Sequence, residues 1–278
     1  MNITIYHHND EDGWASAACV LKKYPQGVCV ALDRNQQVDL VTDQDIVFLL
    51  DFSLKQEELD YIEKNNKEFI WIDHHQSDIQ RLKQHYKGIR QEGKAGCELT
   101  WEYLFNNESM PKIIHYIGRY DVWDLTQEIR AFIIYLQTIL EHSQQPQQIL
   151  HIINTYTQQD YDSAVDVGKQ LLLYQQKQLE KQYKRGIIGT FLGYKAGIYF
   201  TNSNISELGN YCMQKNNDID LFVAVVLITN NVGETFYSYS LRSKEGKVDV
   251  AKLAETQGGG GHPYAAGFKS KNILWNLN

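Results

Sequence analysis

Four short apolar segments, separated by amphipathic ones, constrain what the first 75 residues can form. The apolar segments read NITIYHH (2–8), GVCVALD (27–33), DIVFLLDFS (45–53) and EFIWIDHH (68–75). Between them, WASAACVLKKY (14–24) and KQEELDYIEKNN (55–66) have the apolar spacing of helices. Strands and helices that alternate in this way form a parallel sheet with helices on both faces. The sequence therefore predicts an α/β fold with a parallel sheet, its first helix starting near Trp14.

The spacing of apolar residues changes twice along the rest of the chain. From Cys97 to about residue 185 the apolar spacing is helical, and after Arg185 short β-rich segments return. Four glycines at 258–261 then predict a loop. We expect an N-terminal domain over 1–150, a helical linker over 151–185 and a smaller α+β domain over 186–278.

Composition limits the partners that the chain can have. Hydrophobic residues make up 43% of it, no apolar stretch approaches the roughly 20 residues of a membrane helix, and the N-terminus has no signal-peptide pattern. Four scattered cysteines without a C-x-x-C pair indicate neither a redox motif nor a zinc knuckle. The missing membrane helix and signal pattern lead us to expect a cytoplasmic protein. The net charge is −7 and no basic stripe is present, so we expect no groove for long nucleic acid.

The first, third and fourth predicted strands end in acidic or imidazole side chains, in the segments HHNDEDG, LLDFS and WIDHH. The carboxyl ends of parallel strands are where α/β sheets place their sites. If Asp10 and Asp12 project to the same side, they form a mixed oxygen and nitrogen ligand set with His8, Asp51 and His74. Such a set suits Mn, with Mg, Co, Fe or Zn as alternatives that depend on supply.

Other readings of these segments stay open at this point. HHNDEDG (7–13) is also typical of a solvated acidic turn or a helix cap, but a calcium loop would need glutamate where Leu21 stands. In YIGRYDVWDL (116–125), Asp121 is a candidate further oxygen ligand, although a cap or an ion-pair partner is the commoner role.

Five segments in this order resemble the DHH phosphoesterase superfamily with its DHH-associated C-terminal domain. They are HNDEDG, LLDFS, WIDHH, GRYDVWD and GGGGHPYAAGF, and they span almost the full chain. The opening H-N-D-x-D-G and the Tyr-Asp-x-Trp segment are most similar to the nanoRNase B type of oligoribonucleotide phosphodiesterase. Many relatives carry the first histidine where this chain has Tyr6, so we assign that ligand to His8 and not to His7.

The resemblance implies two Mn-type cations that share one carboxylate. One would be held by His8, Asp10 and Asp51. The other would be held by Asp12, Asp51, His74 and Asp121. The implied catalytic residues are Asp51, His74 and His75, and Asp73 would orient an imidazole or cap the strand end.

The resemblance also implies that the C-terminal domain binds the substrate. The residues to which we carry that role are Arg242, Gly260, Gly261, His262, Asn204 and Ser206. By composition alone, the glycine run is as typical of a flexible linker as of an anion-binding loop.

The implied reaction is the hydrolysis of short oligoribonucleotides to mononucleotides. Alternatives are a 3′-phosphoadenosine 5′-phosphate phosphatase, a dinucleotide phosphodiesterase, a single-strand DNA exonuclease and, in a different class, a non-catalytic nucleotide sensor. Homodimerisation is left open by the sequence.

Overall fold

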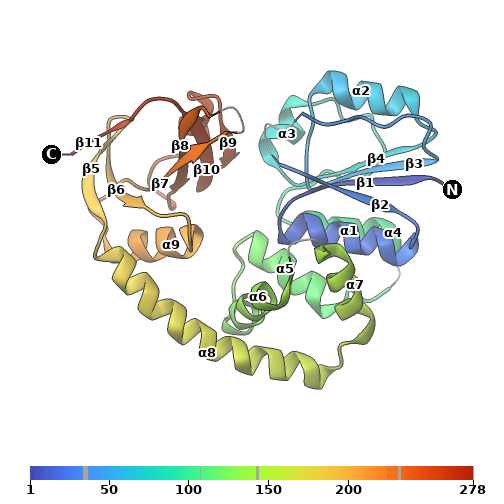
Figure 1. Ribbon diagram of the computed structural model, residues 1–278, viewed down its shortest axis with the longest axis horizontal. Helices are drawn as coiled ribbons and strands as arrows, with labels where there is room; N and C mark the ends of the chain where they lie inside the picture. The colour runs from blue at the N-terminus through green and yellow to red at the C-terminus, as the bar shows by residue number, and fades with distance from the viewer. Residues whose placement is uncertain (34–36, 107, 142–143, 231–232, 278) are drawn as a thin grey trace. The chain divides into compact units, whose positions relative to one another are not determined.

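The chain forms two compact units, which are described separately. The structure is a computed structural model that describes residues 1–33, 37–106, 108–141, 144–230 and 233–277 (Figure 1). The units are Met1–Leu172 and Leu173–Asn278, and their boundary falls inside the long helix α8 (Gln158–Tyr183). Among the described residues, no helix has the combined length and apolar character that crossing a membrane requires.

The first unit is built on a four-stranded parallel sheet with the order β2-β1-β3-β4. The strands are β1 (Ile3–His8), β2 (Val28–Leu32), β3 (Ile46–Leu50) and β4 (Phe69–Ile72). The helices around it are α1 (Glu11–Lys23) and α4 (Gly96–Phe105) on one face, and α2 (Gln56–Asn65) and α3 (Gln76–Arg81) on the other (Figure 1). Because both faces are covered, every residue of β3 and β4 is buried.

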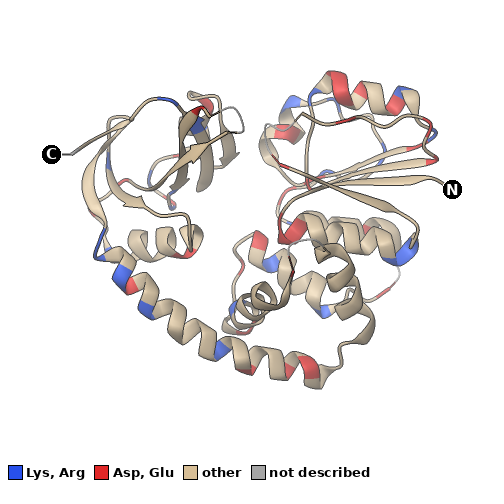
Figure 2. Ribbon diagram, viewed as in Figure 1, with Lys and Arg blue, Asp and Glu red and all other residues tan. Residues whose placement is uncertain are grey.

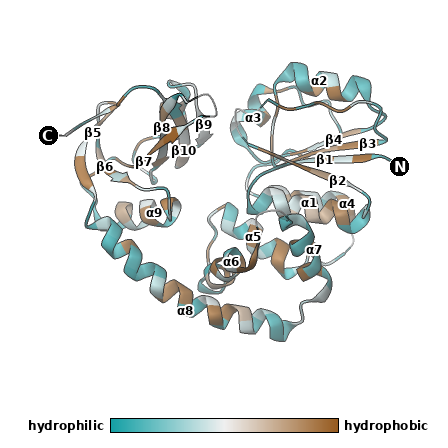
Figure 3. Cartoon of the chain, viewed as in Figure 1, coloured by the Kyte–Doolittle hydropathy of each residue, from teal (hydrophilic) through white to brown (hydrophobic). Residues whose placement is uncertain are grey.

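Side chains alternate across this sheet as the strand geometry requires. Ile5 and Phe48 belong to the core shared with α1 and α4, whereas Leu49 and Trp71 belong to the core shared with α2. Figure 3 shows α2 as mostly hydrophilic, as expected of a helix that buries only one stripe of its surface. The predicted α/β fold with a parallel sheet is confirmed.

The start of α1 differs from the prediction. The helix begins at Glu11, because the Asp10 carboxylate accepts a hydrogen bond from the Gly13 amide at 3.0 Å and caps the helix. The predicted start near Trp14 was wrong for this reason. Asp12 consequently lies in the first helical turn and not on an extended segment.

Three further helices complete the first unit before α8 leads out of it. They are α5 (Lys112–Asp121), α6 (Gln127–Ile139) and α7 (Gln145–Thr155). The segment 151–185, for which we predicted a helical linker, contains the end of α7 and all of α8.

The second unit is a mixed seven-stranded sheet flanked by two helices. The strand order is β11-β5-β6-β7-β8-β10-β9, and only β6 and β7 pair in parallel. The strands are β5 (Ile187–Phe191), β6 (Tyr194–Phe200), β7 (Leu221–Thr229), β8 (Thr235–Arg242), β9 (Gly260–His262), β10 (Ala265–Ser270) and β11 (Trp275–Leu277). Helix α9 (Ile205–Lys215) packs on one face through Leu208, and α10 (Val250–Glu255) packs on the other through Ala254. This confirms the predicted α+β architecture.

We predicted that the whole glycine run forms a loop, and this prediction was wrong for its second half. Gly260 and Gly261 belong to β9, which pairs with β10. Gly261 has a φ of 146°, and a Cβ added there would lie 2.5 Å from the Ala265 carbonyl oxygen. This position therefore accepts only glycine.

Candidate metal centre

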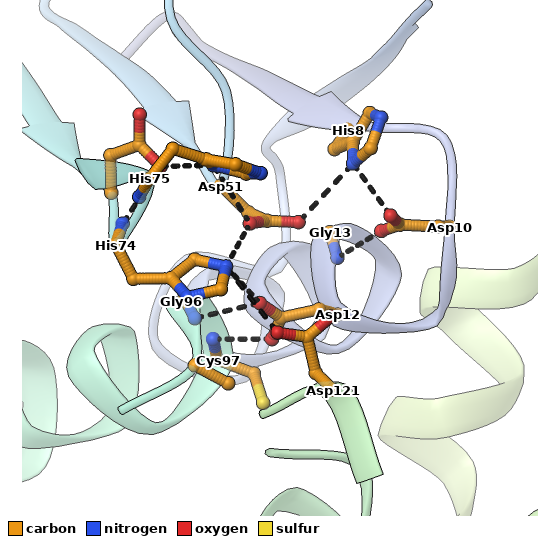
Figure 4. Close-up of polar contacts among 12 residues, drawn as sticks. His8, Asp10, Asp12, Gly13, Asp51, His74, His75, Gly96, Cys97 and Asp121 are labelled. Atoms are coloured by element: carbon orange, nitrogen blue, oxygen red, sulfur yellow. Dashed lines mark hydrogen bonds and ion pairs between the residues drawn. The ribbon is translucent and has the colours of Figure 1, made fainter. Parts of the chain in front are cut away.

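Three neighbouring strands deliver the site residues to one edge of the first sheet (Figure 4). His8 is the last residue of β1, Asp51 directly follows β3, and His74 and His75 follow β4. Asp51 adopts a left-handed conformation with a φ of 53°. Strained backbone of this kind concentrates at functional sites, and aspartate tolerates it better than most residues.

His8, Asp10 and Asp51 form one candidate ligand set. The Nδ1 atom of His8 lies 2.6 Å from Asp10 Oδ2 and 3.5 Å from Asp51 Oδ2. Although it lies close to Asp10, this buried Nδ1 atom makes no hydrogen bond of acceptable geometry to any described residue. Ligand atoms from the three side chains all lie within 4.8 Å of one another, which suits a shared cation.

Asp12, Asp51 and His74 form a second candidate set beside the first. The Nε2 atom of His74 lies 3.2 Å from Asp51 Oδ1, 3.7 Å from Asp12 Oδ2 and 3.4 Å from Asp121 Oδ2. Asp51 therefore presents one oxygen to each set. Its Oδ1 atom is buried and has no hydrogen bond with acceptable geometry in the described structure.

The N-terminus of α4 holds the Asp12 carboxylate, and our sequence reasoning missed this contact. The backbone amides of Gly96 and Cys97 each donate a hydrogen bond of 2.7 Å to Asp12. A helix N-terminus favours an anion in this position. A Cβ on Gly96 would lie 2.7 Å from the Asp51 Cβ atom, so glycine allows α4 to approach the site.

Asp121 comes from the end of α5, which a buried ion pair attaches to α4. Arg119, two residues earlier, donates to Glu98 through Nε at 3.0 Å and through a second, shorter contact from Nη2. Glu98 also accepts the Ala95 amide at 3.1 Å. The start of α4 thus fixes both Asp12 and the turn that carries Asp121. Glu98 and Arg119 were not among our predicted residues.

Asp73 is fully buried and holds His75 in place. Its Oδ1 atom lies 2.7 Å from His75 Nδ1 and also accepts the His74 amide at 2.7 Å. Its Oδ2 atom accepts a hydrogen bond of 2.5 Å from the Ser53 hydroxyl. Because Asp73 occupies the Nδ1 side of the ring, this arrangement favours His75 presenting its Nε2 atom to a ligand.

The histidines and carboxylates of the candidate metal centre shift one another's pKa values. Burial alone would lower the pKa of His8, but Asp10 and Asp51 raise it to about 10. In the same way, burial opposes the charge on His74, but Asp51 and Asp121 raise its pKa to about 11. Burial would raise the pKa of Asp51, but His74 and His8 hold it well below its usual range. A bound cation can replace the imidazolium protons as the partner of these carboxylates.

The remaining predicted residues gather in the second unit. Arg242 ends β8 and donates to the Ser206 hydroxyl at 2.9 Å, while Gly209 of α9 leaves room for its stem. Ala265 pairs with both Arg242 and His262, so those two side chains share a face about 10 Å apart.

Asn204 stands at the N-cap position of α9 in a left-handed conformation, two residues before Ser206, but makes no capping hydrogen bond. Its Oδ1 atom accepts a hydrogen bond from Gln175 Nε2 at 3.1 Å. Among the described residues, His7 belongs to neither candidate ligand set. It is buried, with its Nδ1 atom 2.7 Å from the His8 carbonyl oxygen.

Two proteins resemble this chain over nearly its whole length. Uncharacterized protein R106 of Acanthamoeba polyphaga mimivirus is 27% identical over 299 residues, which covers 98% of this chain and 68% of R106. Oligoribonuclease NrnB of Bacillus subtilis is 24% identical over 307 residues, which covers 98% of this chain and 74% of NrnB.

Solved structures share the fold at lower identity. The pGpG-specific phosphodiesterase PggH from Vibrio cholerae has a TM-score of 0.54 at 13% identity, with 97% of this chain and 93% of PggH covered. Exonuclease RecJ bound to manganese has a TM-score of 0.52 at 13% identity, with 96% and 85% covered.

Two family models match the chain in sequence. Residues 2–118 match the DHH family N-terminal domain, and residues 184–277 match the DHHA1 domain. The chain therefore belongs to the DHH superfamily of metal-dependent phosphoesterases, with a DHH domain followed by a DHHA1 domain.

Proposed function

We propose that this protein hydrolyses short oligoribonucleotides to mononucleotides and that manganese serves as its metal. The observation that carries the proposal is that Asp51 presents one carboxylate oxygen to each of two adjacent ligand sets. Two sets joined by one carboxylate are the arrangement that two-metal phosphoester hydrolysis uses.

The residues present fit such a pair of cations. His8, Asp10 and Asp51 would hold the first, and Asp12, Asp51, His74 and Asp121 would hold the second. Two buried atoms without acceptable hydrogen bonds, His8 Nδ1 and Asp51 Oδ1, are the ligand atoms that this assignment needs. When bound, the cations would supply Lewis acidity and an activated water molecule.

His75 has a role of its own in this proposal. Asp73 holds the Nδ1 side of its ring. Burial would lower the pKa of His75, but the Asp73 carboxylate raises it above its usual value. The raised pKa favours an imidazolium whose Nε2–H can donate to a phosphate oxygen of the substrate. The same proton can pass to the leaving oxygen when the phosphodiester bond breaks. Ser53 fixes Asp73 through its hydrogen bond and so keeps the ring oriented.

The preference for short substrates follows from charge and from the relatives. The chain has a net charge of −7, and Figure 2 shows the lysines and arginines of the described residues scattered along each unit among acidic residues. Long single strands are bound through extended basic grooves, whereas a short substrate needs few phosphate contacts. NrnB, which matches 98% of this chain, is named as an oligoribonuclease.

Phosphate contacts away from the scissile bond are assigned to the second unit. Arg242, Ser206, Asn204, Gly260, Gly261 and His262 are the proposed substrate-binding residues. The guanidinium of Arg242 can bind a phosphate through two parallel hydrogen bonds, which lysine cannot reproduce. Arg242→Lys is therefore expected to raise KM for an oligoribonucleotide while leaving the manganese content unchanged.

A substrate panel with manganese tests the proposed function. It contains RNA and DNA of two to twenty nucleotides, a cyclic dinucleotide and 3′-phosphoadenosine 5′-phosphate. We expect kcat/KM to be highest for RNA of two to five nucleotides and to fall steeply with length. Equal rates on three-mers and twenty-mers would favour an exonuclease of the processive kind. No turnover of any substrate would favour the nucleotide sensor.

A further inference from the structure

The turn after α5 places an unusual residue beside the candidate metal centre. Two backbone hydrogen bonds close the helix: the Trp123 amide donates to the Tyr120 carbonyl at 3.1 Å, and the Asp124 amide donates to the Arg119 carbonyl at 2.8 Å. This bonding pattern is a Schellman motif, and Trp123 occupies its left-handed position with a φ of 61°. Glycine is the usual residue there, because a Cβ makes the conformation unfavourable.

Other left-handed residues of the described chain have a local explanation that Trp123 lacks. Asp43, Asp51 and Asn204 are of the types that tolerate this conformation, and Leu192 stands in a tight turn with Gly193 between paired strands. A tryptophan at a position suited to glycine costs conformational energy, which points to a function of its side chain.

The indole of Trp123 is presented to solvent and supported from behind. All five tryptophans lie in the described part of the chain, and Trp123 alone is exposed, with 38% of its surface accessible. The guanidinium of Arg130 lies over its ring, 5.7 Å from the centroid, and the Tyr120 ring is 6.0 Å away. The exposed part of the indole is the surface that a second flat group could contact.

The backbone at Trp123 lies close to the candidate metal ligand Asp121. Trp123 follows Asp121 by two residues, which limits their Cα separation to about 7 Å. Asp121 contacts His74, and the Glu98–Arg119 pair anchors the same turn to α4. Trp123 therefore belongs to the same anchored turn as a candidate metal ligand.

We propose that Trp123 is a nucleobase subsite, on which a base next to the scissile phosphate stacks. The inference rests on the proposed function, since it needs a substrate with a base near the cleaved bond. Stacking on an aromatic ring tolerates every base, because each has a π-face. A subsite of this kind would bind short RNA of any sequence and needs no basic residues.

The test compares Trp123→Gly with the native protein on three manganese-supported substrates. These are a diribonucleotide and two analogues that each lack one of its two bases. Glycine suits the left-handed position, so the variant is expected to keep its thermal stability and its manganese content. Trp123→Asn, which also tolerates this conformation, serves if the glycine variant fails to fold, and Trp123→Phe keeps an aromatic ring.

If Trp123 stacks on a base, Trp123→Gly lowers kcat/KM for the diribonucleotide by about 10- to 100-fold. It leaves the rate on the analogue without the stacked base unchanged, and Trp123→Phe stays within about threefold of the native protein. Equal losses on all three substrates would overturn the proposal and show that Trp123 only positions Asp121. No loss on any would overturn it as well. Failure of the native protein to hydrolyse the diribonucleotide would instead refute the proposed function.

Discussion

Replacing Arg119 by leucine should damage both the stability of the first unit and one of its two proposed cation sites. Glu98 is only 5% exposed and depends on Arg119 for two of its hydrogen bonds. Removing one partner of a buried ion pair costs about 3–5 kcal/mol, because the remaining charge stays buried. Since the Arg119 side chain is 18% exposed, we expect the lower end, about 3 kcal/mol.

The effect on metal binding should be confined to one site. Arg119 lies two residues before Asp121, so losing its anchor allows Asp121 to move away from His74. Mutating a residue that orients a metal ligand without touching the metal typically weakens metal binding by about 10- to 100-fold. The set formed by His8, Asp10 and Asp51 does not contain Asp121 and should retain its cation.

A double variant separates the two effects. In Glu98→Gln, Arg119→Leu the buried charge is gone, while the glutamine oxygen can still accept the Ala95 amide. Urea unfolding should therefore show that the double variant regains at least half of the lost stability. Calorimetric titration with Mn should show that the weaker site does not recover.

Two results would refute this reasoning. A loss below about 1 kcal/mol for Arg119→Leu would mean that the ion pair is not buried as the structure shows. Recovery of both manganese sites in the double variant would mean that the pair does not position Asp121.

Three further predictions concern the same centre. Because the pKa of His8 is raised to about 10 and that of His74 to about 11, both imidazoles are protonated near pH 7.5 before metal binds. Filling both sites should release at least two protons, because burial also raises the pKa of two further proposed ligands, Asp12 and Asp121. Mn affinity should therefore fall as pH falls; calorimetry in buffers of different ionisation enthalpy measures the proton release, and its absence would contradict the prediction. Gly96→Ala would place a Cβ 2.7 Å from Asp51 Cβ, so bound manganese and activity should both fall, and unchanged values would show that α4 can shift freely. Ser53→Ala should lower kcat about fivefold without changing manganese content, since one hydrogen bond of about 1 kcal/mol is lost, and Ser53→Thr should restore it. Loss of metal in Ser53→Ala would contradict the positioning role.

The sequence could predict the strands and the edge at which they end, for a clear physical reason. A strand buried on both faces must be almost wholly apolar, so the abrupt change from FIWI to Asp73 and His74 marks its end without any alignment. Parallel pairing then places His8 and Asp51 at the same edge.

The way in which Asp10 and Asp12 reach the site could not be predicted in the same manner. We expected them to project to the same side just before the first helix, but Asp10 caps α1 and Asp12 lies inside it. Asp12 is held by the amides of Gly96 and Cys97, which lie 84 and 85 residues away. Local spacing carries no information about such a contact. A glycine at the start of an apolar helix was the one available signal.

For the glycine run, composition predicted a more flexible backbone than the structure has. Four glycines are typical of a flexible loop, but Gly260 and Gly261 form an edge strand against β10. Glycine is required at 261 because the neighbouring strand approaches too closely for a Cβ. Sequence alone does not distinguish a glycine needed for flexibility from one needed for close approach.

Electron paramagnetic resonance of the protein loaded with two equivalents of manganese tests the central claim most directly. We expect a spectrum of two magnetically coupled Mn ions, because Asp51 offers one oxygen to each ligand set. In Asp51→Ala the coupled signal should disappear and turnover should be abolished. Two uncoupled ions in the native protein, or a coupled pair that survives in Asp51→Ala, would contradict a centre built around Asp51.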